Sequence, residues 1–373
     1  MTKTKLMAYQ TNHHLHALNL LPQLGPKRIS TIIDGFENIE DIWQADAKAF
    51  SLLGFDTELS QTIVDHLQNL NIDEALNQLT QEQINLLSFT DTDYPQLLSE
   101  IPQAPPLLYY RGALGPSDEL MVAIVGTRKI STYGRSIVPD FTIELAQSGI
   151  TIVSGLAFGV DALAHQICVD NNFRTIAVVG SGIDTKSVYP KQHQYLSEQI
   201  IATGGAIISE YPPGTPAYKQ HFIARNRIIS GMSTGTLVVE ANLKSGALIT
   251  ARHALDQDRS VYAIPGPIYA EGSQGPHSLI RMGAQLVTKA GDILGDLNIT
   301  DDTTATSINL ADFTPDQQLI LEQLSFEPKN IDEIIQSIEL DASTVTAILT
   351  LLEMKGVIRN IGAQQYVLTH KLK

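Results

Sequence analysis

Apolar residues fall into three patterns along the 373-residue chain, and each predicts a different kind of structure. In residues 1–85 they recur at three- and four-residue spacing, which is typical of short amphipathic helices. From Leu120 onward, short apolar runs alternate with helical patterns, and the first of these runs end in Gly or Ser-Gly. After the polar residues 298–309, helical spacing returns and is followed by two short strand patterns. We therefore expect a helical N-terminal domain, an α/β centre and a small mixed C-terminal domain.

The N-terminal residues 1–85 predict a helical domain of the SAM or helix-hairpin-helix type. Helical spacing covers Ile29–Phe36, Ile39–Phe50 and Leu59–Leu70. The turn Leu24-Gly25-Pro26-Lys27-Arg28 resembles the hairpin of helix-hairpin-helix modules, in which a glycine lets backbone amides approach a phosphate. A simple packing turn explains the same residues, and the acidic charge of the segment favours that interpretation.

The central residues 86–297 predict an extended Rossmann-like domain. Residues 86–114 are rich in proline, which fixes φ and removes an amide donor, so they predict an extended connector without helix. Near-continuous apolar strands that alternate with helices indicate a doubly wound, mostly parallel sheet covered on both faces. The strand-length runs are Met121–Val125, Ile150–Val153, Thr175–Val179, Ala206–Ile208, Thr236–Val239 and Val261–Ile264.

The C-terminal residues 310–373, after a linker at 298–309, predict a winged helix. Three helices are expected at Pro315–Leu324, Asn330–Ile338 and Ala342–Lys355, followed by a hairpin that turns at Gly362. Asn330 with Glu333 is typical of a capping box, and Gly356 suits the residue after a helix end.

Composition places the chain among soluble globular proteins, with 43% hydrophobic and 17% charged residues. No apolar run approaches the roughly 18 residues of a membrane span, and the first residues lack the apolar region of a secretory signal. Cys168 is the only cysteine, which excludes an internal disulfide and a cysteine-based zinc site. We expect a cytoplasmic protein that does not bind a membrane.

The net charge of −15 is distributed unevenly. Residues 1–114 carry 6 Lys and Arg against 14 Asp and Glu, and residues 296–373 carry 5 against 12. Residues 115–295 carry 14 of each. An anion would therefore bind in the centre, although the whole chain is acidic.

Ligands of doubly wound sheets bind at the carboxyl ends of the strands, where turns present amides to anions. The first such turn, Gly126-Thr127-Arg128, is not a GxGxxG sequence, which disfavours a dinucleotide site. Arg128 could grip a phosphate through two parallel hydrogen bonds; taken alone, a surface ion pair explains it equally well. Ser154-Gly155, after the second run, predicts an anion nest, although the nearby Gly159 can also serve close packing.

Two further segments bring cations to the same edge. Gly180-Ser181-Gly182 is followed by Tyr189-Pro190-Lys191. Residues 219–229 combine Lys219, Phe222, Arg225, Asn226 and Arg227, a composition that suits a single strand, because bases stack on rings while phosphates meet cations. A core position is the equal alternative for Phe222.

Two signatures of common enzymes are missing: the sequence has no P-loop and no HExxH motif. We expect no catalytic residue, cofactor or metal. One segment keeps an enzyme as the alternative, because Gly235-Thr236 followed by Glu240 resembles the motif of nucleotide phosphoribohydrolases, which release the base from a nucleoside monophosphate. Gly231-Met232-Ser233 stands in place of that family's glycines, which argues against the catalytic geometry.

The ordered set of motifs resembles the DNA-processing protein A (DprA/Smf) family over nearly the whole chain. The matching segments are Asp93-Tyr94-Pro95, Gly126-Thr127-Arg128, Ser154–Asp161, Gly180–Asp184, Ser209–Gly214, Phe222–Ile229, Glu240-Ala241, Ser245–Ala251 and Ile264-Pro265-Gly266. His193 departs from the pattern, since relatives often carry asparagine there.

This resemblance implies a homodimer that binds single-stranded DNA, protects incoming strands and loads RecA recombinase in natural transformation and homologous recombination. Single-strand-binding protein is an additional candidate partner. The expected strand-binding residues are Gly126, Thr127, Arg128, Ser154, Gly155, Lys191, Lys219, Phe222, Arg225 and Asn226.

The third helix expected in the winged-helix domain, Ala342–Lys355, contains one lysine and no arginine. A helix that reads duplex DNA normally offers Arg, Lys, Asn or Gln to base edges and phosphates. We therefore predict that this domain contacts protein, or nothing, before it contacts duplex DNA.

Overall fold

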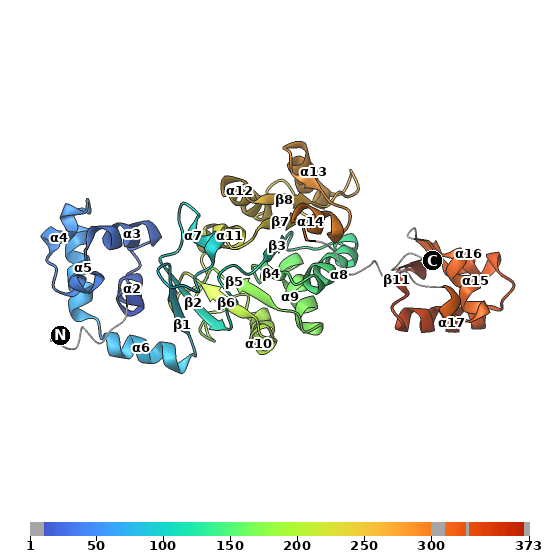
Figure 1. Ribbon diagram of the computed structural model, residues 1–373, viewed down its shortest axis with the longest axis horizontal. Coiled ribbons are helices and arrows are strands. Elements are labelled where there is room, and N and C mark those ends of the chain that lie inside the picture. The colour runs from blue at the N-terminus through green and yellow to red at the C-terminus, as the bar shows by residue number, and fades with distance from the viewer. Residues whose placement is uncertain (1–10, 300–309, 326–327, 369–373) are drawn as a thin grey trace. The chain divides into compact units, whose positions relative to one another are not determined.

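The computed structural model describes residues 11–299, 310–325 and 328–368 (Figure 1). The chain forms two compact units, residues 1–297 and residues 298–373. The first unit is built around a nine-stranded sheet, and the second contains three helices and a three-stranded sheet. The α/β fold class predicted from the sequence is confirmed, including its winged helix.

Six parallel strands form the centre of the large sheet, and each lies within one residue of its predicted apolar run. Nearly all of their side chains are buried, which explains why the sequence shows continuous apolar runs instead of an alternating pattern. The strands are β3 (Met121–Val125), β4 (Thr151–Ser154), β5 (Thr175–Val178), β6 (Ala206–Ser209), β7 (Gly235–Val238) and β8 (Ser260–Ala263).

The strand order of the sheet is β1-β2-β6-β5-β4-β3-β7-β8-β9. From β3 the chain builds β4, β5 and β6 on one side, and then returns to build β7, β8 and the short edge strand β9 (Gln285–Leu286) on the other. The order therefore reverses between β3 and β7, which is the topological switch point where doubly wound sheets usually bind ligands.

Helices cover both faces of the sheet (Figure 1). Successive side chains of β5 point to opposite faces of the sheet, and each face has its own hydrophobic cluster. Ala177 packs in one cluster, and Ile176 and Val178 pack in the other. On the Ala177 side lie α8 (Thr132–Gln147), α9 (Val160–Asp170), α10 (Gln194–Ala202) and α14 (Ala290–Asp296), and on the opposite side lie α7 (Gln96–Ser99), α11 (Lys219–Gly231), α12 (Ala247–Asp256) and α13 (Gln274–Arg281).

The prediction of an extended connector without helix over residues 86–114 is wrong in part, because the segment contributes two strands to the sheet and forms a short helix. Strands β1 (Asn85–Ser88) and β2 (Leu107–Gly112) form an antiparallel pair, and β2 continues the sheet by pairing antiparallel with β6. The short helix α7 lies between them despite the prolines. The density of proline obscured the apolar residues Leu107, Leu108 and Tyr109, which are fully buried and drive this strand into the sheet.

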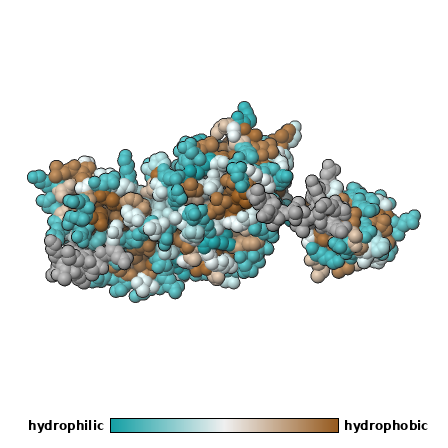
Figure 2. All heavy atoms as spheres, viewed as in Figure 1, coloured by the Kyte–Doolittle hydropathy of each residue, from teal (hydrophilic) through white to brown (hydrophobic). Residues whose placement is uncertain are grey.

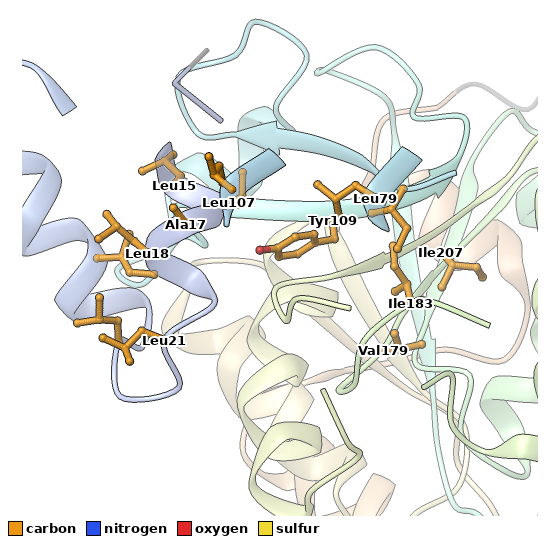
Figure 3. Packing of buried hydrophobic residues seen from close by; sticks show 14 of the residues in the cluster. Leu15, Ala17, Leu18, Leu21, Leu79, Leu107, Tyr109, Val179, Ile183 and Ile207 are labelled. Carbon is orange, nitrogen blue, oxygen red and sulfur yellow. The ribbon is translucent and has the colours of Figure 1, made fainter. Parts of the chain in front are cut away.

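The N-terminal helices pack against β2 through a buried tyrosine. The Tyr109 hydroxyl accepts a hydrogen bond from the Asn19 amide at 3.2 Å and lies 2.9 Å from Nδ1 of His16. Figure 3 shows Tyr109 pointing toward the helix that carries Leu15 and Leu18. The helices are α2 (Thr11–Asn19), α3 (Pro26–Gly35), the 3₁₀ helix η1 (Ile39–Trp43), α4 (Ala47–Leu52), α5 (Thr57–Asn69) and α6 (Ile72–Gln81).

The second unit has its own hydrophobic core and the predicted three helices with a hairpin. Asn330 caps its helix by accepting from the Asp332 amide, while the reciprocal capping box lies instead at Thr314 and Gln317. Gly356 has φ +70° after the third helix, as a helix end requires. The elements are η4 (Leu310–Asp312), α15 (Pro315–Gln323), β10 (Lys329–Asn330), α16 (Ile331–Ser337), α17 (Ala342–Met354), β11 (Ile358–Gly362) and β12 (Gln365–Leu368).

Among the described residues, no single helix has the length and hydropathy to cross a membrane, and only the pair α16 and α17, bent by 120°, meets that test when taken together.

Candidate nucleic-acid interface

The turns after β3 and β4 are locked together by close backbone contacts. The amide of Val160 donates to the carbonyl of Thr127 at 3.2 Å. Gly159 has φ +83°, and a Cβ there would lie 2.2 Å from the same carbonyl oxygen. Gly126 is equally confined, because its Cβ would lie 2.5 Å from the Val160 side chain. These glycines therefore bring two backbones close together, while the side chain of Arg128 remains exposed at the surface.

Glu240, two residues after β7, joins the turn after β3 at the switch point. The Thr127 amide donates to the Glu240 carbonyl at 2.7 Å. Each carboxylate oxygen of Glu240 accepts a hydrogen bond from Ser131, from its amide at 3.0 Å and from its hydroxyl at 2.5 Å. Ser131 caps α8, so a negative charge here is stabilised by the N-terminal end of that helix. Glu240 therefore positions the start of α8 against the end of β7, with a hydrogen bond from Ser131 to each carboxylate oxygen.

Arg225 lies beneath the surface, where it holds two strand ends together. Its guanidinium donates to the carbonyls of Gly155, at 2.7 Å, and Val178. Burial lowers the pKa of Arg225 to about 10 and raises that of the neighbouring Asp161 to about 6. Asp161 in turn accepts from the Gly155 amide at 3.2 Å. The sequence predicted that Arg225 contacts single-stranded DNA, and that stays a prediction; in the structure its guanidinium donates to backbone carbonyls at the ends of β4 and β5.

Three exposed side chains and one half-buried ring make up what we call the Arg128–Phe222 cluster: Arg128, Tyr189 and Lys219 are exposed, and Phe222 is half-buried. The guanidinium carbon of Arg128 lies 5.7 Å from the centroid of the Phe222 ring, within the range of a cation–π contact. The rings of Phe222 and Tyr189 are 5.6 Å apart. Phe222 is thus partly exposed between a cation and a second ring and does not lie in the core.

The cluster depends on the start of α11. Lys219 is the first residue of α11 and is exposed, and it lies three residues before Phe222, on the same side of the helix. Gly180 after β5 lets the helix approach, because a Cβ there would lie 3.0 Å from the backbone of His221. The N-cap residue Tyr218 makes no capping hydrogen bond through its side chain, so the N-terminal end of α11 favours an anion.

The other predicted site residues lie outside the Arg128–Phe222 cluster and differ in how deeply they are buried. Ser154 is fully buried, and its hydroxyl donates to the Ile124 carbonyl at 2.6 Å. Asn226 donates to the Gly246 carbonyl at 3.2 Å, at the start of α12. Gly155 is buried under Arg225. Lys191 is exposed at the start of the 3₁₀ helix η2 (Lys191–His193), two residues after Tyr189.

The sequence analysis noted the Tyr189-Pro190 dipeptide but did not place Tyr189 among the candidate site residues. In the structure its ring contacts Phe222. Tyr189 is 42% exposed and lies in the long connection after β5, which brings it against α11. Its distance in sequence from Phe222 left no local pattern that could have paired the two rings. Among the described residues, no group of three His, Cys, Asp or Glu side chains could hold a metal ion.

A family model described as DNA recombination-mediator protein A matches residues 85–298, and a model of the DprA winged helix domain matches residues 304–362. The chain is 34% identical to the protein Smf of Synechocystis, over 92% of this chain and 95% of that protein.

Two solved structures share the fold. The DNA processing protein A of Streptococcus pneumoniae matches with a TM-score of 0.66 and 34% identity, covering 77% of this chain and 98% of that one. The DNA processing protein A of Helicobacter pylori, whose structure is described for its single-stranded DNA binding mode, matches with a TM-score of 0.52 and 30% identity, covering 58% of this chain and 96% of that one.

Proposed function

The chain belongs to the DNA recombination-mediator protein A (DprA/Smf) family, and from this premise we propose that it binds single-stranded DNA at the Arg128–Phe222 cluster without catalysing a reaction. The observation that carries the proposal is the contact between the Arg128 guanidinium and the Phe222 ring, with Tyr189 beside it. A flexible strand presents a phosphate and an unpaired base at each step, and this cluster offers a cation and a ring face to match them.

The distribution of charged residues along the chain supports the same location for the DNA-binding site. The centre of the chain holds 14 of the 25 Lys and Arg residues, and the acidic surplus lies in the flanking segments. Arg128, Lys191 and Lys219 are exposed and stand at the carboxyl edge of the sheet or in the connections that follow it. Arg225, Ser154 and the turn glycines act by fixing the backbone beneath these side chains. Binding should show little base preference, because stacking and phosphate contacts are shared by every sequence.

A gel-shift comparison of single- and double-stranded oligonucleotides tests this proposal. We expect the protein to shift the single strand at concentrations that leave the duplex free. Equal affinity for both, or binding to neither, would contradict the proposed function.

The alternative enzyme, a nucleoside-monophosphate phosphoribohydrolase, depends on Glu240. Its side chain is 5% exposed, and each carboxylate oxygen accepts a hydrogen bond from Ser131, which holds the group at the start of α8 and away from solvent. We propose that the protein releases no free base from nucleoside monophosphates even at high protein concentration. Release that disappears in Glu240→Gln would establish the enzyme instead.

We further propose that the bound strand is handed to RecA recombinase, and that the protein acts as a homodimer in the cytoplasm, in natural transformation or homologous recombination. Exposed apolar side chains support self-association: Leu286 lies in the edge strand β9 and Met282 shortly before it, while Ile268 and Tyr269 lie in the connection that follows β8, the strand paired with β9. Figure 2 shows hydrophobic side chains at the surface in the region of α12 and α13. A group of exposed apolar side chains of this kind is typical of protein–protein contacts.

Two measurements test these partners. Light scattering should give twice the chain mass, and Leu286→Lys should give the mass of one chain. RecA filament assembly on strands coated with single-strand-binding protein should be faster when this protein is present, and an unchanged rate would argue against the loading role.

A further inference from the structure

A hollow of about 490 Å³ opens beside the Arg128–Phe222 cluster, and Arg128 lines it. Its walls come from the turns after β3 and β4, the first turn of α8, the outer face of α9, and η2 with α10. Ligand sites typically have volumes of roughly 300–1,000 Å³, so the hollow has room for a nucleotide. Of the four residues of the Arg128–Phe222 cluster, only Arg128 lines this hollow.

The walls of the hollow carry an unbalanced positive charge. Arg128, Lys129 and Arg135 line it, and none of its lining residues is a carboxylate. All three cations are exposed, and in the parts of the chain that the structure describes none of them forms an ion pair. In a chain of net charge −15, such a group of cations attracts phosphates more strongly than its surroundings do.

Aromatic rings complete the hollow. The rings of Phe158 and His193 meet edge to face at 4.8 Å. Nδ1 of His193 donates to the Leu156 carbonyl at 2.8 Å, which fixes the orientation of the imidazole. Tyr195 lies on the adjacent turn of α10 and is 74% exposed.

We propose that this hollow is the second part of the single-strand path. The nucleotide that adjoins the one at Phe222 enters it, and its base stacks on Tyr195 and the Phe158–His193 pair. Its phosphates meet Lys129 and Arg135. The inference rests on the proposed function, because Arg128 belongs to both parts of the path. It extends the site from one cluster to a path that holds successive nucleotides.

A length series tests this path in the full-length protein. Oligothymidylates of about 4 to about 16 nucleotides span the usual site sizes of single-strand binding modules. Tyr195→Ala should weaken binding of the longer strands about 10-fold, as expected for the loss of a stacked base, and should spare the shortest strands, which the Arg128–Phe222 cluster alone can hold. Phe89→Ala removes an exposed ring elsewhere and should change neither. No loss, or the same loss at every length, would overturn the inference.

The cations of the hollow give an independent measurement. Replacing Lys129 and Arg135 together by alanine should reduce the slope of log affinity against log salt by about 1.4, since each phosphate contact on a single strand contributes about 0.7. Lys48→Ala, at an exposed site in α4, should leave the slope unchanged. An unchanged slope in the double variant would contradict phosphate binding in the hollow.

Photo-crosslinking distinguishes the failure of this inference from the failure of the proposed function. A single strand that carries iododeoxyuridine is bound, irradiated and mapped by mass spectrometry. We expect adducts on Tyr195 or Phe158 as well as on Phe222 or Tyr189. Adducts only on Phe222 or Tyr189 would overturn the path and leave the proposed function intact, whereas adducts on none of the four would overturn both.

Discussion

The guanidinium group of Arg128 lies over the ring of Phe222, 5.7 Å from its centroid, although the two residues belong to different parts of the fold. Arg128 follows β3, and Phe222 lies in the first turn of α11. The backbone beneath them is closely packed at two glycines: a Cβ at Gly159 would collide with the Thr127 carbonyl oxygen, and one at Gly180 would press tightly on the backbone of α11. A cation and a ring held together in this way form one binding unit, which suits the alternation of phosphate and base along a strand.

Phe222→Ala should weaken binding of single-stranded DNA about 10-fold, because a stacked base loses its ring. The salt dependence should stay unchanged, since no phosphate contact is removed. Fluorescence anisotropy at several salt concentrations measures both quantities. Phe89→Ala, at an exposed ring beside β1, serves as the control. If Phe222→Ala bound single-stranded DNA with full affinity, Phe222 would serve only in packing, and the proposed stacking would be wrong.

Arg225→Met should lower the free energy of unfolding by about 3–5 kcal/mol, because it leaves Asp161 buried without its opposite charge and leaves two buried carbonyls, of Gly155 and Val178, without their donor. Urea denaturation followed by circular dichroism measures the loss. Arg252→Ala, at an exposed arginine of α12, should change stability by less than about 0.5 kcal/mol. A similar small effect for both variants would contradict the structural role assigned to Arg225.

Stability should fall when the pH is lowered below neutrality. Burial lowers the pKa of His16 to about 4 and that of His165 to about 3, so both stay neutral in the fold while the unfolded chain takes up protons near pH 6.5. The stability that these residues contribute is therefore complete above about pH 6.5 and is lost as the pH falls toward about 4 for His16 and about 3 for His165. Asp161, whose pKa burial raises to about 6, has the opposite effect over part of this range.

Each histidine contributes up to about 1.4 kcal/mol per pH unit within that range. Urea denaturation at several pH values should therefore show a shallower loss for His16→Asn, which keeps a polar group near Tyr109 and cannot take up the proton. Parallel curves for the variant and the original protein would contradict the assignment of His16.

The residue 306–373 segment should not bind duplex DNA at micromolar concentration, even at low salt. Exposed positions of α17 offer Ser343, Thr346, Ala347, Thr350 and Leu351, and none of these carries a positive charge. Without cations, a helix gains little from the phosphates of the duplex. A fluorescence titration with labelled duplex measures this, and micromolar binding would refute the prediction.

The sequence allowed the central strands to be predicted well, because strands buried on both faces must be apolar throughout. It failed for β1 and β2, where the prolines at 102, 105 and 106 masked a buried antiparallel strand beginning at Leu107. Local pattern carries no information on such pairing, because β2 adds to the sheet beside β6, a strand almost one hundred residues later in the chain.

The candidate site was predicted as a region, since glycine-rich turns must gather at the carboxyl edge of a parallel sheet. Which side chains reach the surface could not be predicted, because Lys219 and Arg225 lie in the same helix and have the same sign of charge. Only the tertiary structure shows that Lys219 is exposed while Arg225 binds buried carbonyls. Tyr189 and Phe222 likewise became neighbours only through the approach of α11 to the turn after β5.

The central claim, that a single strand binds through the Arg128–Phe222 cluster, is tested most directly by the affinity of Arg128→Ala for single-stranded oligonucleotides of different sequence. Lys48→Ala removes the same charge from an exposed site outside the cluster and serves as the control. We predict that Arg128→Ala weakens binding to all sequences alike and reduces the salt slope by about 0.7, while Lys48→Ala changes neither. Unchanged affinity and slope in Arg128→Ala would contradict the account.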